Sequence, residues 1–439
     1  MFNRAKGKSS KLFLISAGSG LPLTLLFLLI EFFDELAFGS IGAALPVVRA
    51  ELGLSYSQIG LLFGLPAFAS VLIEPAIMLL GDTGLRKRLV VSGGLLIALA
   101  LLMMASARSF PLLLAAFALS YPASGAFVSL SQATLIDIHP RREAHMMARW
   151  TLAGSLGVLL GPLLIAAGLS LALGWRPAVF ALAGLALVLA LLTLPRRFPS
   201  PTTPAGTLAS SEAQIPAAPQ PASPATAAHT TLARATMSPG QVRTGLWAIY
   251  HNLWALLRDP QVLRWIVLLQ FSDLLLDVLY GYAPLYLTDV VGVTAAQAGL
   301  LLGAIMLASL ASDAALIPLL ERLPGRRLVR ISSAVTLLLY ATMLLAPWPV
   351  VKIGLLILVG FTTLGWYSVL TGEAYASARG RSGSLMALGS FAGLLGGGMA
   401  WLVGYTAEWF GLASAMWLLL LGPLALALFV PPAVEAKEK

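Results

Sequence analysis

Acidic side chains stand inside several long apolar segments of this 439-residue sequence. A charged group within a bilayer is costly, so such residues usually face a water-filled cavity or one another and mark ion or substrate pathways. Glu31 with Asp34, and Asp273 with Asp277, are three and four residues apart, a spacing that places each pair on one side of a helix. The pattern predicts a membrane-embedded carboxylate site for a cation. The candidates are Glu31, Asp34, Glu35, Glu74, Asp273, Asp277, Asp313 and Glu373, with Gln132 near the position that corresponds to Glu373.

These acids have no basic residue beside them in the middle of their segments, the nearest being Arg149 and Arg264 near segment starts. Their negative charge must then be neutralised by a bound cation or by a proton on the carboxyl group. Because the two compete for one site, exchange follows, and we expect H+ or Na+ as the coupling ion and no cofactor. A divalent metal would bind at Asp34 and Asp273. An anionic substrate is disfavoured because it needs an Arg or Lys clamp.

The alternative for the acids is structural, since some of them, Glu31 and Glu35 first, could serve only to hydrogen-bond neighbouring helices. A similar choice applies to the aromatic residues Tyr282, Trp366 and Tyr367 at the same level. Their rings could stack on a flat or cationic ligand. Otherwise they are packing residues or anchors at the membrane interface.

The composition requires helices that cross a membrane. Hydrophobic residues make up 58% of the chain and charged residues only 11%, with a mean hydropathy of +0.87. A helix of roughly 20 apolar residues spans the hydrocarbon core, and only helices or closed barrels satisfy their backbone there. The apolar runs predict helices near 21–47, 57–80, 89–107, 110–136, 145–171 and 177–194, then 262–288, 296–320, 328–346, 351–376, 384–406 and 412–431.

The segment between the two sets is rich in Pro, Ala, Ser and Thr from Phe198 to Gly240, which is typical of a flexible linker. We expect an N-terminal bundle at 1–195, a partly disordered cytoplasmic linker at 196–261 and a C-terminal bundle at 262–439. Short cytoplasmic loops collect Lys and Arg. With both termini cytoplasmic, all basic residues except Arg49, Arg108, Arg176 and Lys352 fall on the cytoplasmic side.

This topology explains the net charge of +9 without nucleic acid. It predicts a multi-pass protein of the cytoplasmic (plasma or inner) membrane. The expected partners are the lipid bilayer and a small molecule or ion, and we expect a monomer.

The two halves repeat each other. LGLSYSQIGLLFG at 52–64 matches VGVTAAQAGLLLG at 291–303, an offset of 239 residues. The same offset pairs Asp34 with Asp273, Glu74 with Asp313 and Gly154 with Gly393. Parallel repeats of this kind are typical of secondary transporters that hold the substrate near the midplane between their halves.

After the second segment the chain reads GDTGLRKR (81–88), and after the eighth ERLPGRR (321–327). Both loops resemble the Asp-Arg-x-Gly-Arg-Lys/Arg loop of the major facilitator superfamily, although Thr83 and Leu85 depart from that pattern. The resemblance covers essentially the whole chain. It implies an all-α integral membrane fold of twelve transmembrane helices in two pseudo-symmetric six-helix bundles.

An acid beside a basic cluster can latch neighbouring helices through charge-assisted bonds. The alternative is that these residues only carry the positive charge that is usual for cytoplasmic loops. The expected latch residues are Asp82, Arg86, Lys87, Glu321, Arg322, Arg326 and Arg327.

GSLGVLLGPLLIAAG at 154–168 is similar to the Gly-x-x-x-Gly-Pro motif of the antiporter branches, carried here by Gly157, Gly161 and Pro162. Such residues let helices approach closely and flex, and plain close packing is the alternative. The drug:proton antiporter signature has an Arg four residues before a Gly, where this chain has Tyr121 before Gly125.

The function that we favour is secondary active transport by alternating access, with proton-coupled export of a cationic or amphipathic small molecule. The alternatives are a cation-coupled uptake symporter, a divalent-metal carrier and, less favoured, a lipid flippase or a channel. An enzyme or ATP-driven pump is not expected, because the sequence has no Walker loop, His-Glu-x-x-His or Gly-x-Ser-x-Gly.

Overall fold

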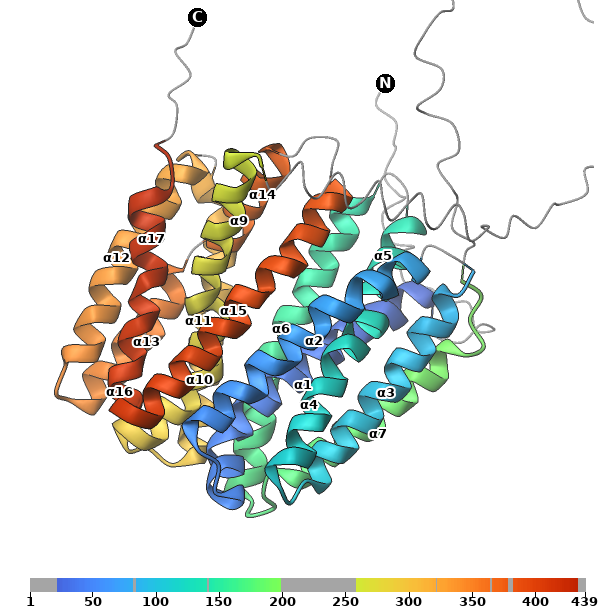
Figure 1. Cartoon of the computed structure of the whole chain (residues 1–439), viewed down its shortest axis with the longest axis horizontal. Coiled ribbons are helices and arrows are strands. Elements are labelled where there is room, and N and C mark those ends of the chain that lie inside the picture. The colour runs from blue at the N-terminus through green and yellow to red at the C-terminus, as the bar shows by residue number, and fades with distance from the viewer. Residues whose placement is uncertain are drawn as a thin grey trace, which may run out of the picture.

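The computed structural model describes residues 22–81, 84–139, 142–198, 258–320, 322–363, 365–377 and 382–432. These residues form long helices that run side by side (Figure 1). The first half contains α1 (Leu23–Leu52), α2 (Tyr56–Gly81), α3 (Arg86–Ser106), α4 (Phe110–Ser124), the π-helical turn η1 (Gly125–Ser129), α5 (Leu130–Asp137), α6 (Glu143–Ser170) and α7 (Arg176–Thr193).

The second half begins with one long segment that changes its helical type three times. It consists of α9 (Pro260–Asp273), the π-helical turn η2 (Leu274–Val278), α10 (Leu279–Tyr286) and the π-helical turn η3 (Leu287–Val291). The remaining elements are α11 (Ala295–Leu320), α12 (Gly325–Leu345), α13 (Pro349–Thr362), α14 (Trp366–Ser377), α15 (Ser382–Phe410), α16 (Leu412–Ala415), the 3-10 turn η4 (Met416–Leu420) and α17 (Leu421–Phe429).

Nine helices in the described ranges are long and apolar enough to cross a membrane. The segments α1, α9 to η3, and α15 complete the twelve that the sequence predicts, so the all-α transmembrane fold is confirmed. Most helix ends lie within a few residues of the predicted ones. The first helix is longer than predicted because it continues to Leu52, where Gly53 adopts φ 62° and its N–H bonds the Arg49 carbonyl. A left-handed glycine is the usual way to end a helix.

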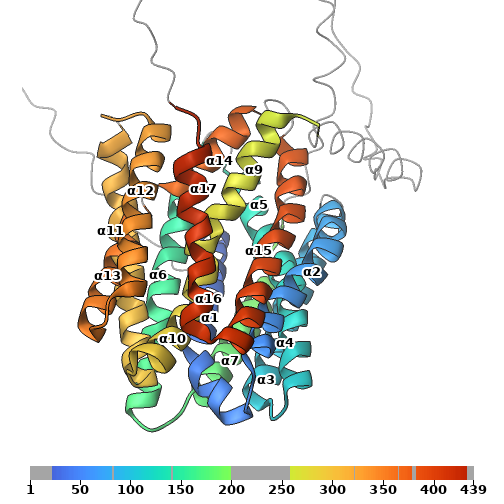
Figure 2. The same ribbon diagram turned by 60° about the vertical axis from the view of Figure 1, so that its left-hand side comes forward.

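Helices of residues 22–198 and of residues 258–432 lie on opposite sides of the molecule (Figures 1 and 2). Contacts between the two sides are made mainly by α2 against α15 and by α6 against α11. The predicted domain boundaries remain a prediction, because most of the predicted linker, residues 199–257, lies outside the described residues.

Polar contacts between the halves gather at one end, here named the Arg49 end. The Arg49 guanidinium is 2.8 Å from Asp289 Oδ2, and the Tyr56 hydroxyl donates to the same oxygen at 2.6 Å. The Ser57 backbone N–H donates to Glu408 at 3.3 Å. These bonds join α1 and α2 to η3 and α15. The opposite end, named the Arg326 end, carries the two predicted signature loops.

Candidate functional site

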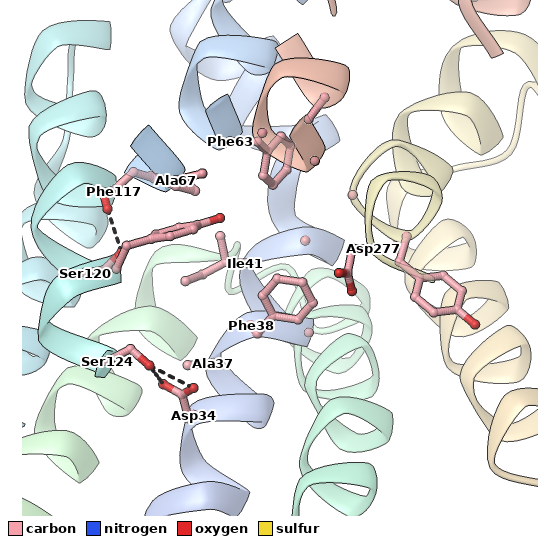
Figure 3. Close-up of a pocket in the computed structure, with 18 of the residues that line it drawn as sticks. Asp34, Ala37, Phe38, Ile41, Phe63, Ala67, Phe117, Ser120, Ser124 and Asp277 are labelled. Carbon is pink, nitrogen blue, oxygen red and sulfur yellow. Dashed lines mark hydrogen bonds between the residues drawn. The ribbon is translucent and has the colours of Figure 1, made fainter. Parts of the chain in front are cut away.

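A cavity of about 540 Å³ lies between the two halves and receives side chains from α1, α2 and α4 on one wall and from α9, η2, α10 and α15 on the other. Figure 3 shows part of this lining. Asp34, Glu35, Glu74, Asp273 and Asp277 all line it. No Lys, Arg or His of the described chain does so. The structure therefore brings together acids from both halves in one space without a basic partner.

Asp34 is held by a serine from a neighbouring helix. The Ser124 hydroxyl, at the end of α4, is 3.1 Å from each Asp34 carboxylate oxygen (Figure 3). Ser124 directly precedes the π-helical turn η1, and such turns are frequent at functional sites. The hydroxyl bridges both oxygens, so it fixes the orientation of Asp34 toward the cavity.

Glu74 is positioned by its own helix and by a glycine opposite. The Ser70 hydroxyl, one turn earlier on α2, donates to the Glu74 carboxylate. A Cβ at Gly125 would lie only 3.0 Å from Glu74 Cγ. Because Gly125 has no side chain, the Glu74 carboxyl can pack against η1 and still border the cavity.

On the opposite wall Asp273 ends α9 and Asp277 lies within η2. The Gln270 amide donates to Asp273 at 3.3 Å, while Figure 3 shows the Asp277 carboxylate directed toward Phe38. The sequence predicted one regular helix with the two acids four residues apart on one side. The helix contains a π-helical turn at this point, and both acids line the same cavity as predicted.

Aromatic rings form the apolar part of the lining. Phe63 lies 6.5 Å from Phe117 and 6.0 Å from Tyr282, between ring centroids. Tyr282 borders the cavity as predicted, but its hydroxyl donates to the Ala400 carbonyl at 2.8 Å. The Tyr282 side chain is also fully buried, so it supports the cavity wall and presents no free hydroxyl to a ligand. Sequence reasoning missed Phe38, which follows Asp34 by four residues and so shares its helix face.

Glu31 does not project into the cavity with Asp34. It is buried where α1 meets α6, and a Cβ at Gly154 would lie 2.7 Å from its carboxylate oxygen. Residues four apart on a helix differ by about 40° and residues three apart by about 60° in the other sense. Glu31 and Glu35 therefore both contact Gly154, whereas Asp34 does not.

Several other predicted site residues do not line the cavity. Trp366 is fully buried and its indole N–H donates to Ser332 at 2.8 Å, whereas Tyr367 is 62% exposed. The Gln132 amide contacts the Met147 sulfur at 3.7 Å. Asp313 is exposed on α11 outside the cavity lining. None of these four residues is part of the cavity lining, and their predicted role in binding stays a prediction.

Glu373 does not line the cavity but pairs with Arg326, one of the predicted latch residues. The Arg326 guanidinium donates to both Glu373 carboxylate oxygens at 2.7 and 2.6 Å, joining α12 to α14. In the first half Arg86 pairs with one carboxylate oxygen of Asp137 at the end of α5, while its Nε donates to the Gly81 carbonyl at 2.7 Å. Asp82 and Glu321 lie outside the described residues. No ion pair is found for Lys87, Arg322 or Arg327 with other described residues.

The predicted glycine motif of α6 packs against α1. A Cβ at Gly157 would lie 2.3 Å from the Phe32 carbonyl oxygen, and one at Gly161 would lie 2.6 Å from the Ser40 nitrogen. A Cβ at Gly39 would lie 3.1 Å from Pro162 Cδ. The motif therefore holds two backbones in direct contact, which is the packing alternative.

The sequence profile of the Major Facilitator Superfamily matches residues 27–400. The chain belongs to the major facilitator superfamily. This membership and the fold make it a multi-pass membrane transporter and not an enzyme. No curated protein sequence matches the chain.

Solved structures show the same fold in other members. A bacterial homolog of the human lysosomal transporter Spinster, inward-facing and occupied, has 14% identity and a TM-score of 0.68, covering 93% of this chain and 95% of its own. The nucleoside transporter NupG has 15% identity and a TM-score of 0.66, covering 93% of this chain and 98% of its own.

Proposed function

We propose that this superfamily member exchanges protons for a cationic, partly apolar small molecule and so exports it. The observation that carries the proposal is the charge of the cavity. Five carboxylates from both halves line it, and no basic side chain of the described residues faces them. A carboxylate in a poorly solvated space needs a proton or a cation. Either one can satisfy these acids, so the two compete.

The size and the apolar lining of the cavity favour an organic cation. A volume of about 540 Å³ lies within the range of pockets for drug-sized ligands. Phe38, Phe63 and Phe117 line the cavity, and aromatic ring faces attract cations. The buried Gln270 Oε1 accepts no hydrogen bond from the described residues. A protonated amine would supply that missing donor.

Alternating access follows from where the halves touch. At the Arg49 end Asp289 accepts bonds from Arg49 and Tyr56 of the other half. At the Arg326 end the ion pairs of Arg86 and Arg326 stay within one half. This arrangement supports access to the cavity from the Arg326 end, which the sequence places in the cytoplasm. Export would require the Arg49 contacts to part.

A divalent-metal carrier is less favoured, because no group of three or more His, Cys, Asp or Glu side chains in the described ranges is arranged to hold a metal ion. Proton-coupled uptake of a neutral solute, such as the nucleoside named for NupG, remains the main competitor. A lipid flippase is also less favoured, since an anionic headgroup would meet only acids here.

Charge-reversed probes of nearly equal size and shape test the proposal. Tetraphenylphosphonium is a cation and tetraphenylborate an anion, and their binding to the purified protein can be compared by calorimetry. We expect binding of the cation only. Asp277→Asn should weaken it at least tenfold, since opposite unit charges roughly 6 Å apart attract each other by about 3 kcal/mol at an effective dielectric constant of about 20. Glu51→Gln removes an acid that bonds Arg176 outside the cavity and should change nothing.

Transport in proteoliposomes then tests coupling. The native protein should move tetraphenylphosphonium against its gradient only when a pH gradient is imposed, and Asp34→Asn should abolish this while passive leak stays equal. Movement of uridine driven by the same gradient, with no movement of the organic cation, would establish the competing uptake function instead.

A further inference from the structure

A second cavity, about 660 Å³, lies on the outer surface between α12 and α17 near the Arg326 end. These two helices lie side by side in both views (Figures 1 and 2). Arg327 and Arg330 line one end of this groove, and Pro432, beyond α17, lies beside them. It is separate from the central cavity, with which it shares no lining residue.

The groove changes from basic to apolar along α12. Arg327 and Arg330 are both exposed in the first two turns. Below them Ile331, Val335 and Leu338 line the groove and are 49%, 42% and 70% exposed. On a helix that crosses a membrane, exposed apolar side chains face lipid tails. The two arginine side chains therefore lie at headgroup level, next to an apolar surface that suits an acyl chain.

Within the described ranges, the two arginines, Arg327 and Arg330, form no ion pair. Arg326 in the same turn, by contrast, is bonded to Glu373. In the repeat Arg327 corresponds to the basic residue Lys87, whereas Arg330 has no basic counterpart. With the one extra residue of the second loop, Arg330 corresponds to Val90, which is buried.

We infer that this groove binds an anionic phospholipid, with the phosphate between Arg327 and Arg330 and an acyl chain along Val335 and Leu338. The guanidinium group matches phosphate oxygens through paired N–H donors. Basic pockets between transmembrane helices on the cytoplasmic side are suited to anionic headgroups. The apolar wall distinguishes this ligand from a free phosphate ion, which would gain nothing from it.

Native mass spectrometry of the full chain in detergent tests the inference. Phosphatidylglycerol and phosphatidylcholine with identical acyl chains are titrated, and we expect one phosphatidylglycerol to be retained preferentially. Arg327→Gln with Arg330→Gln should weaken its binding about thirtyfold, since each arginine near an anionic headgroup contributes roughly fivefold. Arg88→Gln with Arg264→Gln removes two other exposed arginines and should leave binding unchanged.

Equal retention of the two lipids, or an equal loss in both double variants, would overturn the inference and indicate general surface attraction. A competition measurement on the native protein needs no variant. Soluble glycerol phosphate should not displace phosphatidylglycerol, because it lacks the acyl chain. If it displaces the lipid at similar concentration, the groove is a free-anion site and the lipid assignment is wrong.

Discussion

Helices α6 and α15 correspond in the two halves, since the repeat pairs Gly154 with Gly393, yet their glycines have different neighbours. On α6, Gly157 and Gly161 touch the backbone of α1 in their own half. On α15, a Cβ at Gly393 would meet no atom within 4 Å, and one at Gly396 would meet only Gln270 Oε1 at 3.5 Å. Both α15 glycines line the central cavity instead.

The closest contacts of Gly397 and Gly404 on α15 are made with the other half. A Cβ at Gly397 would lie 2.8 Å from Ala67 Cβ, and one at Gly404 would lie 2.5 Å from the Tyr56 carbonyl oxygen. The first half is therefore closed on itself by α1 and α6, whereas α15 borders the cavity and rests on α2. We expect the contact of α1 with α6 to stay fixed and the contact of α2 with α15 between the halves, here named the separable contact, to open.

The largest expected effect is on stability. Gly157→Ala would place a methyl group 2.3 Å from the Phe32 carbonyl oxygen, so α1 and α6 must separate, at about 1–3 kcal/mol for overpacking. Thermal unfolding in detergent should show a clear loss. Gly393→Ala adds the same methyl group where no atom lies within 4 Å and should unfold like the native chain. Equal losses in both variants would mean that α6 and α15 do not differ in this way.

The next effect is on binding at the two walls. Ser124→Ala removes the hydroxyl that orients Asp34 from another helix, and tetraphenylphosphonium affinity measured by calorimetry should fall about tenfold. Ser272→Ala is its control, because that hydroxyl bonds its own helix at Leu269 at 2.6 Å and Asp273 only at 3.4 Å. The two walls would be equivalent if both variants lost affinity alike.

A smaller effect concerns the separable contact. Gly64→Ala would bring a methyl group to 2.9 Å from the Gly397 carbonyl oxygen, and the strain can be relieved when α2 and α15 part. The chain contains no cysteine, so spin labels at Ala50→Cys and Phe410→Cys report the Arg49 end alone by pulsed electron resonance. We expect the population with separated labels to rise several-fold and stability to fall less than in Gly157→Ala. Unchanged distances would show that α2 and α15 do not separate.

The smallest effect comes from the ion pair between the halves. Arg49 and Asp289 are partly exposed, and such pairs contribute about 0–1 kcal/mol. Arg49→Gln should raise the separated population of the same labels at most about fivefold. Arg326→Gln breaks a pair within one half and should leave these distances unchanged. A larger shift from Arg326→Gln would assign the control of the Arg49 end to the latch.

The long helices were predictable from the sequence because every segment that crosses a bilayer needs roughly 20 apolar residues. The predicted helix near 57–80 is found as Tyr56–Gly81 and that near 110–136 as Phe110–Asp137. The π-helical turns within two segments were not predictable, since they depend on what packs beside them. Glu373 was placed with the cavity acids because its partner Arg326 is 47 residues away in sequence.

The amino-acid sequence is enough to specify a twelve-segment membrane protein with two related halves and several acids at mid-membrane, because apolar length, basic loops and repeat register are properties of the chain itself. Which acids share a cavity depends on the tertiary structure. It directs Asp34 toward Ser124, presses Glu31 against Gly154 and joins Glu373 to Arg326. A side chain's direction depends on helix rotation, and that rotation is set by the neighbouring helices and not by the apolar pattern of any one segment.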